Sequence, residues 1–188
     1  MGSRIRIVGT SGSGKSVLAE RVAARTGLAR LDLDATFWDA DWSFRDLDQA
    51  RDLVRAFVSA HPEGWVADGN WNARLGDLLA PGAPGGADTV VWLDLPRHRV
   101  MRQVVVRTLR RGLRREELWH GNRERLGNLL RIDPEQNIVR WAWTSHHDNR
   151  ARMLQRIATG EEIVRLRDRA EIDAWLASLP AAERSVEP

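Results

Sequence analysis

The segment that most constrains what this chain can fold into is Gly9-Thr10-Ser11-Gly12-Ser13-Gly14-Lys15-Ser16. It fits the pattern G-x-x-x-x-G-K-[ST], in which glycines let successive backbone N–H groups face a polyphosphate. Residues 4–8 before it alternate like a strand, and apolar residues at 17–23 after it have helical spacing. The sequence therefore predicts a strand, a phosphate-binding loop and a helix that binds a nucleoside triphosphate at its N-terminus.

Each residue type in this loop has a chemical reason. Lys15 is expected to reach the β- and γ-phosphates, and the hydroxyl of Ser16 is expected to ligate Mg²⁺. We expect nucleotide contacts from Gly9, Thr10, Ser11, Gly12, Ser13, Gly14, Lys15, Ser16 and Val17. The alternative is a glycine- and serine-rich turn that binds nothing.

The remaining chain alternates short apolar strands with helical patterns. Strands are predicted over residues 4–8, 28–33, 65–67, 89–93 and 162–166. Helices are predicted over residues 15–26, 46–60, 71–79, 98–110, 123–132, 135–158 and 169–178. This alternation predicts an α/β fold with a parallel sheet. The 188 residues fit a single domain, expected over 1–180, with a disordered tail over 181–188.

Composition excludes several classes of protein. The chain has no cysteine, so disulfide scaffolds, cysteine–zinc sites and cysteine nucleophiles are ruled out. It has no apolar run near the roughly 18 residues of a membrane span. Its N-terminus lacks the apolar stretch of a secretory signal. We therefore expect a cytoplasmic protein without a membrane partner.

Carboxylates follow the predicted strands, where ligands of open α/β sheets bind. Asp32 and Asp34 are predicted to close the second strand with side chains on one side, so both are candidates for acceptor binding. Asp34 is the candidate that orients or deprotonates an acceptor hydroxyl. The alternative is an edge strand whose charges block pairing with other chains.

Asp68 ends the third strand, where a carboxylate on the Mg²⁺ side is expected in this architecture. The alternative is a turn residue, because Asp-Gly-Asn is typical of turns. Arg74 is a candidate partner for an anionic substrate, or else a solvated helix residue. Trp38 is a candidate for stacking on a flat substrate, although core packing is the commoner role of tryptophan. Asp94 is predicted to cap the next helix.

Arginine dominates the basic residues: 28 are Arg, and Lys15 is the single lysine. The net charge is only +3, but residues 97–125 hold ten Arg against three Glu. The arginines after residue 100 in this segment are Arg102, Arg107, Arg110, Arg111, Arg114, Arg115, Arg123 and Arg125. Arg107 and Arg111 are expected on one helix face, where their repulsion needs an anionic partner.

Three interpretations of this basic segment remain open. It is a lid over about 107–125 that closes on the phosphates, a surface that binds nucleic-acid phosphates, or a solvated helix. The lid interpretation gains from the segment's place after the fourth strand and from Gly112 and Gly121 as hinges. In it, Arg107 and Arg111 stabilise the transferring phosphoryl group, and Arg110, Arg114 and Arg115 belong to the lid. A nucleic-acid partner is disfavoured but stays open.

Five segments together carry a resemblance to a known family. They are residues 9–16, Leu-Asp-Leu-Asp-Ala-Thr-Phe-Trp at 31–38, Trp-Val-Ala-Asp-Gly-Asn-Trp at 65–71, Leu-Asp-Leu-Pro-Arg at 93–97 and Ile-Val-Arg-Leu-Arg at 163–167. On these motifs the chain, from about residue 4 to 179, resembles the adenylate-kinase-like small P-loop proteins of the FlaR type, which are labelled DNA-topology-modulation proteins.

This resemblance implies a three-layer P-loop kinase fold with strand order 2-3-1-4-5 and a lid after strand four. It gives ATP contacts to Gly9, Gly12, Gly14, Lys15 and Ser16. Asp68 and Arg74 match two positions of the adenylate-kinase segment Asp-Gly-Phe-Pro-Arg, but its Phe-Pro pair is absent, which puts AMP as the acceptor in doubt.

The sequence thus favours a kinase that uses ATP and Mg²⁺, held by Ser16 and Asp68, to phosphorylate a small molecule, possible acceptors including nucleosides and nucleotides. The alternative function is a nucleotide-dependent regulator or a DNA-associated ATPase without a small-molecule acceptor.

Overall fold

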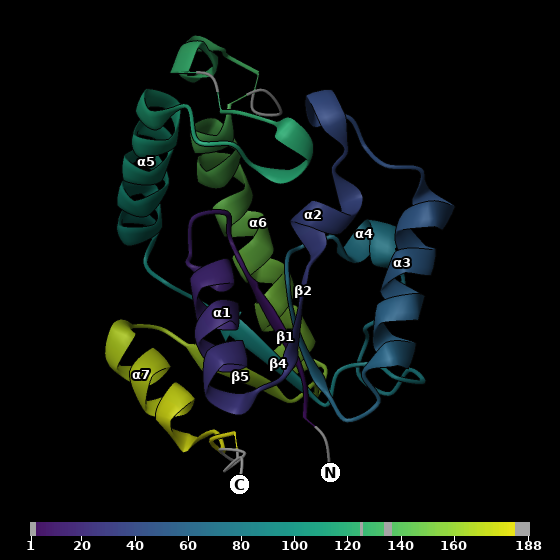
Figure 1. Ribbon diagram of the computed structural model, residues 1–188. Helices are drawn as coiled ribbons and strands as arrows, with labels where there is room; N and C mark the ends of the chain where they lie inside the picture. Colours follow the sequence, from purple (N-terminus) through teal and green to yellow (C-terminus); the bar gives the residue numbers. More distant parts are fainter. Residues whose placement is uncertain (1–2, 125, 134–136, 183–188) are drawn as a thin grey trace, which may run out of the picture.

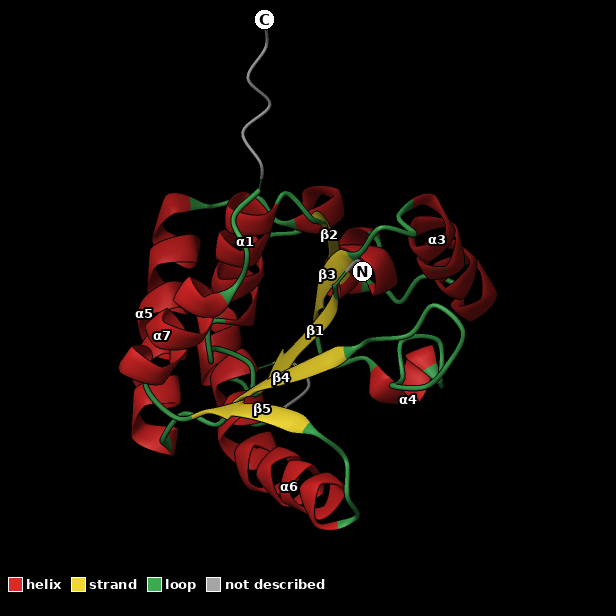
Figure 2. Cartoon of the chain, turned by 90° about the horizontal axis from the view of Figure 1, so that it is seen from below, coloured by secondary structure: helices red, strands yellow, loops and turns green. Residues whose placement is uncertain are grey.

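A computed structural model describes residues 3–124, 126–133 and 137–182. Within them, five parallel strands form one sheet in the order β2-β3-β1-β4-β5. The strands are β1 (Arg4–Gly9), β2 (Ala29–Asp32), β3 (Trp65–Asp68), β4 (Thr89–Leu93) and β5 (Ile163–Leu166). The predicted α/β class (Figure 1) and the strand order implied by the family resemblance (Figure 2) are confirmed.

Helices cover both faces of the sheet, which gives three layers (Figure 2). On one face, α1 (Lys15–Thr26) and α7 (Arg169–Ser178) bury apolar residues such as Val22 and Leu176 against Ile5 and Ile7. On the other face, α3 (Leu47–Ala60), α4 (Asn72–Leu75) and α6 (Ile138–Ala158) pack with Val8 and Trp92. The alternation of buried residues along β1, odd positions to one face and even positions to the other, follows from the strand period of two.

Several predicted helix boundaries are wrong. The helix predicted over 71–79 is a single turn, α4, because Gly76 ends it in a backbone conformation (φ 58) that favours glycine. The helix predicted over 98–110 is longer: α5 spans Arg97–Arg114. Of the helix predicted over 123–132, the described residues form a short 3₁₀ turn, Leu126–Leu130, and residue 125 lies outside the described residues. Residues 134–136, the start of the predicted helix 135–158, lie outside the described residues, as do 183–188 of the predicted tail.

The second strand ends earlier than predicted. β2 stops at Asp32, whose side chain accepts hydrogen bonds from the backbone N–H groups of Asp34 and Ala35 and so begins the helix α2 (Leu33–Phe37). The prediction that Asp32 and Asp34 are two positions apart in one strand is therefore wrong. Asp34 lies in the first turn of α2, beyond the carboxyl end of the sheet.

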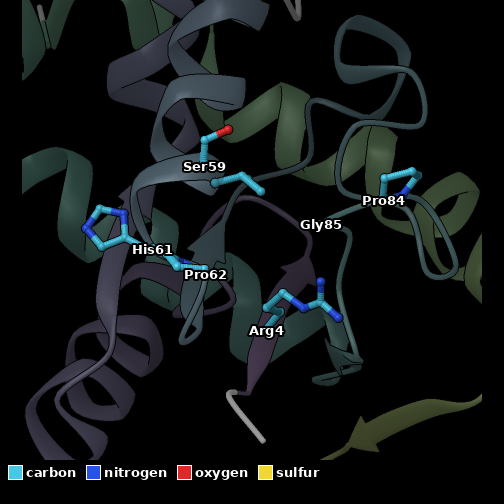
Figure 3. Close-up of a pocket in the computed structure, with 7 residues that line it drawn as sticks. Arg4, Ser59, His61, Pro62, Pro84 and Gly85 are labelled. Atoms are coloured by element: carbon cyan, nitrogen blue, oxygen red, sulfur yellow. The ribbon is translucent and has the colours of Figure 1, made fainter.

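A cavity of about 360 Å³ opens at the amino end of the sheet, between Arg4, the end of α3 and the loop around Pro84 (Figure 3). Because the phosphate-binding loop leaves the opposite end of β1, this cavity is separate from the nucleotide site. Among the described helices, none is long and apolar enough to cross a membrane.

Candidate functional site

The loop between β1 and α1 has the backbone that a phosphate cradle needs. Gly9, Gly12 and Gly14 have φ values of 152°, 85° and 94°. Residues with a side chain rarely adopt these backbone conformations. Gly12 also packs closely on α5: a Cβ there would lie 2.5 Å from Cγ2 of Val104. The glycines therefore serve both the loop conformation and the approach of the helix that carries the arginines.

Asn70 fixes the start of this loop to the neighbouring strand end. Its side-chain amide donates to the carbonyl of Gly9 at 2.7 Å and accepts from the N–H of Gly9 at 3.2 Å. The amide thus extends the pairing between β1 and β3 by one step after β3 has ended. The sequence placed Asn70 in a turn motif and in the segment 65–71 of the family resemblance, but no local signal indicated that its side chain would reach Gly9.

Ser16 and Asp68 meet where the sequence predicted the metal side of the site. The Ser16 hydroxyl donates to Oδ2 of Asp68 at 2.6 Å, and Arg30 donates to Oδ1 at 3.0 Å. Asp68 is 1 % exposed, and burial raises its pKa while Ser16 and Arg30 lower it. Arg30, which the sequence analysis did not single out, therefore supplies charge balance for a buried carboxylate.

Lys15 and Asp34 are both withdrawn from water, and the charge of each opposes the pKa shift that burial causes in the other. Burial lowers the pKa of Lys15, and Asp34 is the nearby charge that most opposes this shift. Burial likewise raises the pKa of Asp34, against the influence of Lys15. Lys15 Nζ contacts the carbonyl of Thr10 at 3.3 Å.

An indole orients Asp34. Nε1 of Trp71 donates to Oδ1 of Asp34 at 2.7 Å, and Oδ2 accepts no hydrogen bond within the described part of the chain. Trp71 is itself fixed by stacking on Phe37, with ring centroids 4.9 Å apart. One carboxylate oxygen is thus held, and the other remains available for a substrate hydroxyl.

Both carboxylate oxygens of Asp32 accept hydrogen bonds within the protein. Oδ1 caps α2, and Oδ2 accepts from Nε1 of Trp119 at 2.9 Å. Trp119 lies in the 3₁₀ turn Trp119–Gly121, which follows α5. Next to it, Asn122 donates to the carbonyl of Asp39 and accepts from the N–H of Trp42. The segment after α5 therefore docks onto the segment after α2.

Arg107 and Arg111 lie on the inner side of α5, as their spacing predicted. Burial lowers the pKa of Arg107, and its Nε is buried without a hydrogen-bond partner among the described residues. Arg111 donates to Glu124 at 3.0 Å and lies 3.9 Å from Glu116. Glu124, which sequence reasoning did not single out, is thus the anionic partner expected for these two arginines.

The other predicted site residues have different surroundings. Arg110, Arg114 and Arg115 are exposed, and Arg110 lies 3.8 Å from Glu116. Arg74 lies over the ring of Phe44, with its guanidinium carbon 4.5 Å from the centroid, and donates to the carbonyl of Arg45. Trp38 stacks on Phe44, and Val17 is exposed at the start of α1. Asp94 was predicted as a helix cap, and this is wrong: α5 begins at Arg97 with Pro96 at the N-cap and no side-chain cap, and Asp94 pairs with Arg150 and Arg165.

The residues present fit a magnesium nucleotide. Mg²⁺ prefers oxygen ligands and keeps several waters, using one or two protein oxygens plus phosphate. Ser16 and Asp68 supply a hydroxyl and a carboxylate side by side at the first turn of α1. Among the described residues, no group of three or more His, Cys, Asp or Glu side chains could hold a metal ion by itself.

Comparison with known proteins supports the fold. No protein-family model matches the chain. The sequence is 26 % identical over 194 residues to the uncharacterized protein YqaC of Bacillus subtilis (strain 168), which covers all of this chain and 89 % of that protein. The narrower resemblance to FlaR-type proteins stays a prediction.

Solved kinases have the same architecture. Shikimate kinase from Acinetobacter baumannii, in complex with shikimate, matches 93 % of this chain and 89 % of its own with a TM-score of 0.53 and 17 % identity. Shikimate kinase from Bacteroides thetaiotaomicron matches 93 % and 94 %, with a TM-score of 0.52 and 12 % identity. A gluconokinase from Sinorhizobium meliloti 1021 matches 93 % and 91 %, with a TM-score of 0.51 and 18 % identity. This chain therefore has the fold of the small P-loop kinases.

Proposed function

We propose that this protein is a kinase that transfers the γ-phosphoryl group of ATP to a hydroxyl group of a small molecule. The observation that carries the proposal is the carboxylate of Asp34, which lies beyond the end of β2 and is held through Oδ1 by Trp71. Lys15 of the phosphate-binding loop is the nearby charge that most opposes the rise of the Asp34 pKa caused by burial. A switch that only binds a nucleotide needs the lysine but no oriented carboxylate. An ATPase can use such a carboxylate to orient water, so the test below separates a kinase from an ATPase by its response to an acceptor.

In the proposed reaction, Oδ2 of Asp34 accepts the proton of the acceptor hydroxyl. The acceptor oxygen forms a bond to the γ-phosphorus while the bond from that phosphorus to its bridging oxygen breaks. ADP leaves with the electron pair of the broken bond, and Asp34 is left protonated until the proton passes to solvent. The raised pKa of Asp34 makes it a stronger base than an exposed aspartate.

The cationic side chains stabilise charge on the phosphates. Lys15 binds the β- and γ-phosphate oxygens, and Arg107, whose buried Nε lacks a partner among the described residues, donates to the transferring group. Arg111 joins it when the phosphates displace Glu124. When bound through Ser16 and Asp68, Mg²⁺ neutralises the phosphate charge further.

On the acceptor side, Asp34 and the aromatic residues around Trp71 contact the small molecule, with Trp38 and Arg74 at the edge. Asp32 acts there through its cap of α2, which sets the position of Asp34. Of the lid predicted over about 107–125, α5 supplies the residues up to Arg114. The following segment, 115–124, closes over both substrates, with Trp119 bonded to Asp32.

The test is a measurement of ADP release over a panel of nucleosides, nucleotides, sugars and hydroxy acids, with Lys15→Ala as the inactive control. We expect at least one hydroxyl compound to raise ADP release at least tenfold above the acceptor-free rate. If every compound leaves the rate unchanged, while Lys15→Ala still abolishes the basal rate, the protein is an ATPase or regulator and the proposal is wrong.

A further inference from the structure

A second arginine cluster lies away from the phosphate-binding loop, where β4 and β5 end. It surrounds a pocket of about 320 Å³, between the start of α5, the middle of α6 and the end of β5. Its lining residues are Asp94, Leu95, Pro96, Arg97, His146, Arg150, Arg165 and Arg167. Arg165 is the partner in register of Trp92, which packs in the cluster that α6 joins, whereas α1 packs in the cluster on the opposite face. Figure 2 shows α1 and α6 on opposite sides of the sheet.

Asp94 organises two of the arginines. Its carboxylate, 6 % exposed, accepts from Nε of Arg150 at 3.1 Å through Oδ1, and from Nε of Arg165 at 2.9 Å through Oδ2. Arg165 also lies near the ring of Trp92, 5.2 Å from its centroid. A buried carboxylate that accepts from two guanidinium groups holds both in fixed positions. Little side-chain conformational entropy is then lost when a ligand binds to their remaining N–H groups.

Arg97 is held in place by an aromatic ring and a backbone carbonyl rather than by a carboxylate. Its guanidinium stacks on the ring of Trp143 at 3.4 Å, and it donates to the Trp143 carbonyl at 2.8 Å. Its Nε is buried without a hydrogen-bond partner, and no carboxylate of the described residues forms an ion pair with it. A buried guanidinium N–H without an acceptor is costly, so this group favours an anion in the pocket.

The charges in the pocket do not balance. Four arginines line it, while the carboxylates that pair with them within the described chain are Asp94 and Glu171, the latter bound to Arg167. This leaves an excess of two positive charges, which matches a phosphate dianion. Guanidinium groups bind phosphate oxygens through paired N–H donors, and the volume has room for an organic group attached to the phosphate.

We propose that this pocket is a second anion site, independent of the phosphate-binding loop, which binds the phosphate group of a small phosphorylated molecule. Arg97 is the arginine that the ligand engages most directly, because Asp94 already holds Arg150 and Arg165, and Glu171 holds Arg167. The proposal does not depend on the kinase activity, since none of these residues belongs to the nucleotide or acceptor site.

The first test uses the full-length Lys15→Ala protein, in which the phosphate-binding loop is weakened, and titrates it calorimetrically with pyrophosphate and with phenyl phosphate. We expect binding at one site. Arg97→Gln in this background should weaken that binding at least tenfold. Arg169→Gln, which removes an exposed arginine outside the pocket, is the matched control and should leave it unchanged.

A second test needs no substitution. Phenylglyoxal modifies accessible arginines, and peptide mass spectrometry reports the extent at each position. We expect pyrophosphate to protect Arg97 and Arg167 of the wild-type protein but not Arg169. Absence of binding to Lys15→Ala, equal binding by Arg97→Gln, or equal protection of all three arginines would each overturn the proposal.

Discussion

Nε1 of Trp71 lies 2.7 Å from Oδ1 of Asp34, which joins the turn after β3 to the first turn of α2. Because Phe37 stacks on the same indole, the ring cannot turn away without losing packing as well as the hydrogen bond. The carboxylate proposed as the base is therefore oriented by a residue of another element.

Replacing this donor while keeping an aromatic ring tests the orientation directly. Trp71→Phe should retain the contact with Phe37 but lose the hydrogen bond to Asp34. A hydrogen bond to a charged group contributes about 1.5–3 kcal/mol, so kcat should fall by roughly ten- to a hundredfold. KM for ATP should stay unchanged. Steady-state kinetics measure both constants, and a change confined to KM for ATP would contradict the positioning role.

The same carboxylate should lower stability at neutral pH. Burial raises the pKa of Asp34, so folding favours its protonated form. The stability from this shift is present in full below the unfolded pKa of about 3.9 and is lost as pH rises through the folded-state pKa. Asp34→Asn, which cannot ionise, should therefore have the higher Tm at pH 7, by an amount that shrinks as pH falls.

Thermal unfolding followed by circular dichroism between pH 5 and 8 measures this difference. Asp77→Asn, at an exposed position on the same side of the molecule as α4, is the control and should show no such gain. The prediction also requires that Asp34→Asn lose at least a hundredfold in phosphoryl transfer, since a base contributes about 10²–10⁴. A variant that is both less stable at pH 7 and fully active would disprove both roles.

Two glycines of the loop should differ in their tolerance of alanine. Both Gly12 and Gly14 have positive φ, which costs a non-glycine residue about 1–2 kcal/mol. Only Gly12 would also bring a Cβ against Val104, whereas a Cβ at Gly14 meets nothing within 4 Å. We expect Gly12→Ala to lower Tm more than Gly14→Ala and to abolish ATP binding.

A second substitution checks that the clash is the cause. Val104→Ala removes the Cγ2 atom that a Cβ at position 12 would meet, so the double variant should recover part of the Tm lost by Gly12→Ala. Differential scanning fluorimetry with and without ATP reports both effects. Simple additivity of the two substitutions would show that α5 does not restrict this loop position.

The contact between Ser16 and Asp68 predicts a magnesium phenotype. Asp68→Asn removes a carboxylate whose partners are Ser16 and Arg30. Half-maximal ADP release should then need at least ten times more Mg²⁺, because fewer anionic oxygens hold the ion. Titration of ADP release with MgCl₂ gives this value, and Asp77→Asn serves again as the control. An unchanged requirement would place the metal away from Asp68.

The sequence predicted what depends on local pattern. The loop from Gly9 to Ser16 followed from a specific motif and the α/β class from alternating elements, whereas the strand order was implied by the family resemblance alone. The end of β2 could not be predicted in this way, because an aspartate such as Asp32 can be either a strand residue or a helix cap. In the structure its side chain caps α2, so the strand ends there.

Contacts between segments that are far apart in the chain also could not be predicted from the sequence. Asn70 reaches Gly9 across 61 positions, and Trp119 reaches Asp32 across 87. The contact of Glu124 with Arg111 could not be predicted, because no sequence pattern indicates which arginine of a basic segment a glutamate will contact. Asp94 was assigned to a helix cap, although the packing of α6 against β5 brings Arg150 and Arg165 to it.

The most direct test of the kinase account follows the γ-phosphoryl group itself. With [γ-³²P]ATP, Mg²⁺ and a compound that stimulates ADP release, the account predicts that the label appears on the acceptor, one for each ADP formed. Asp34→Asn should still bind ATP but label the acceptor at least a hundredfold more slowly. Label released only as inorganic phosphate, at equal rates in wild type and Asp34→Asn, would contradict it.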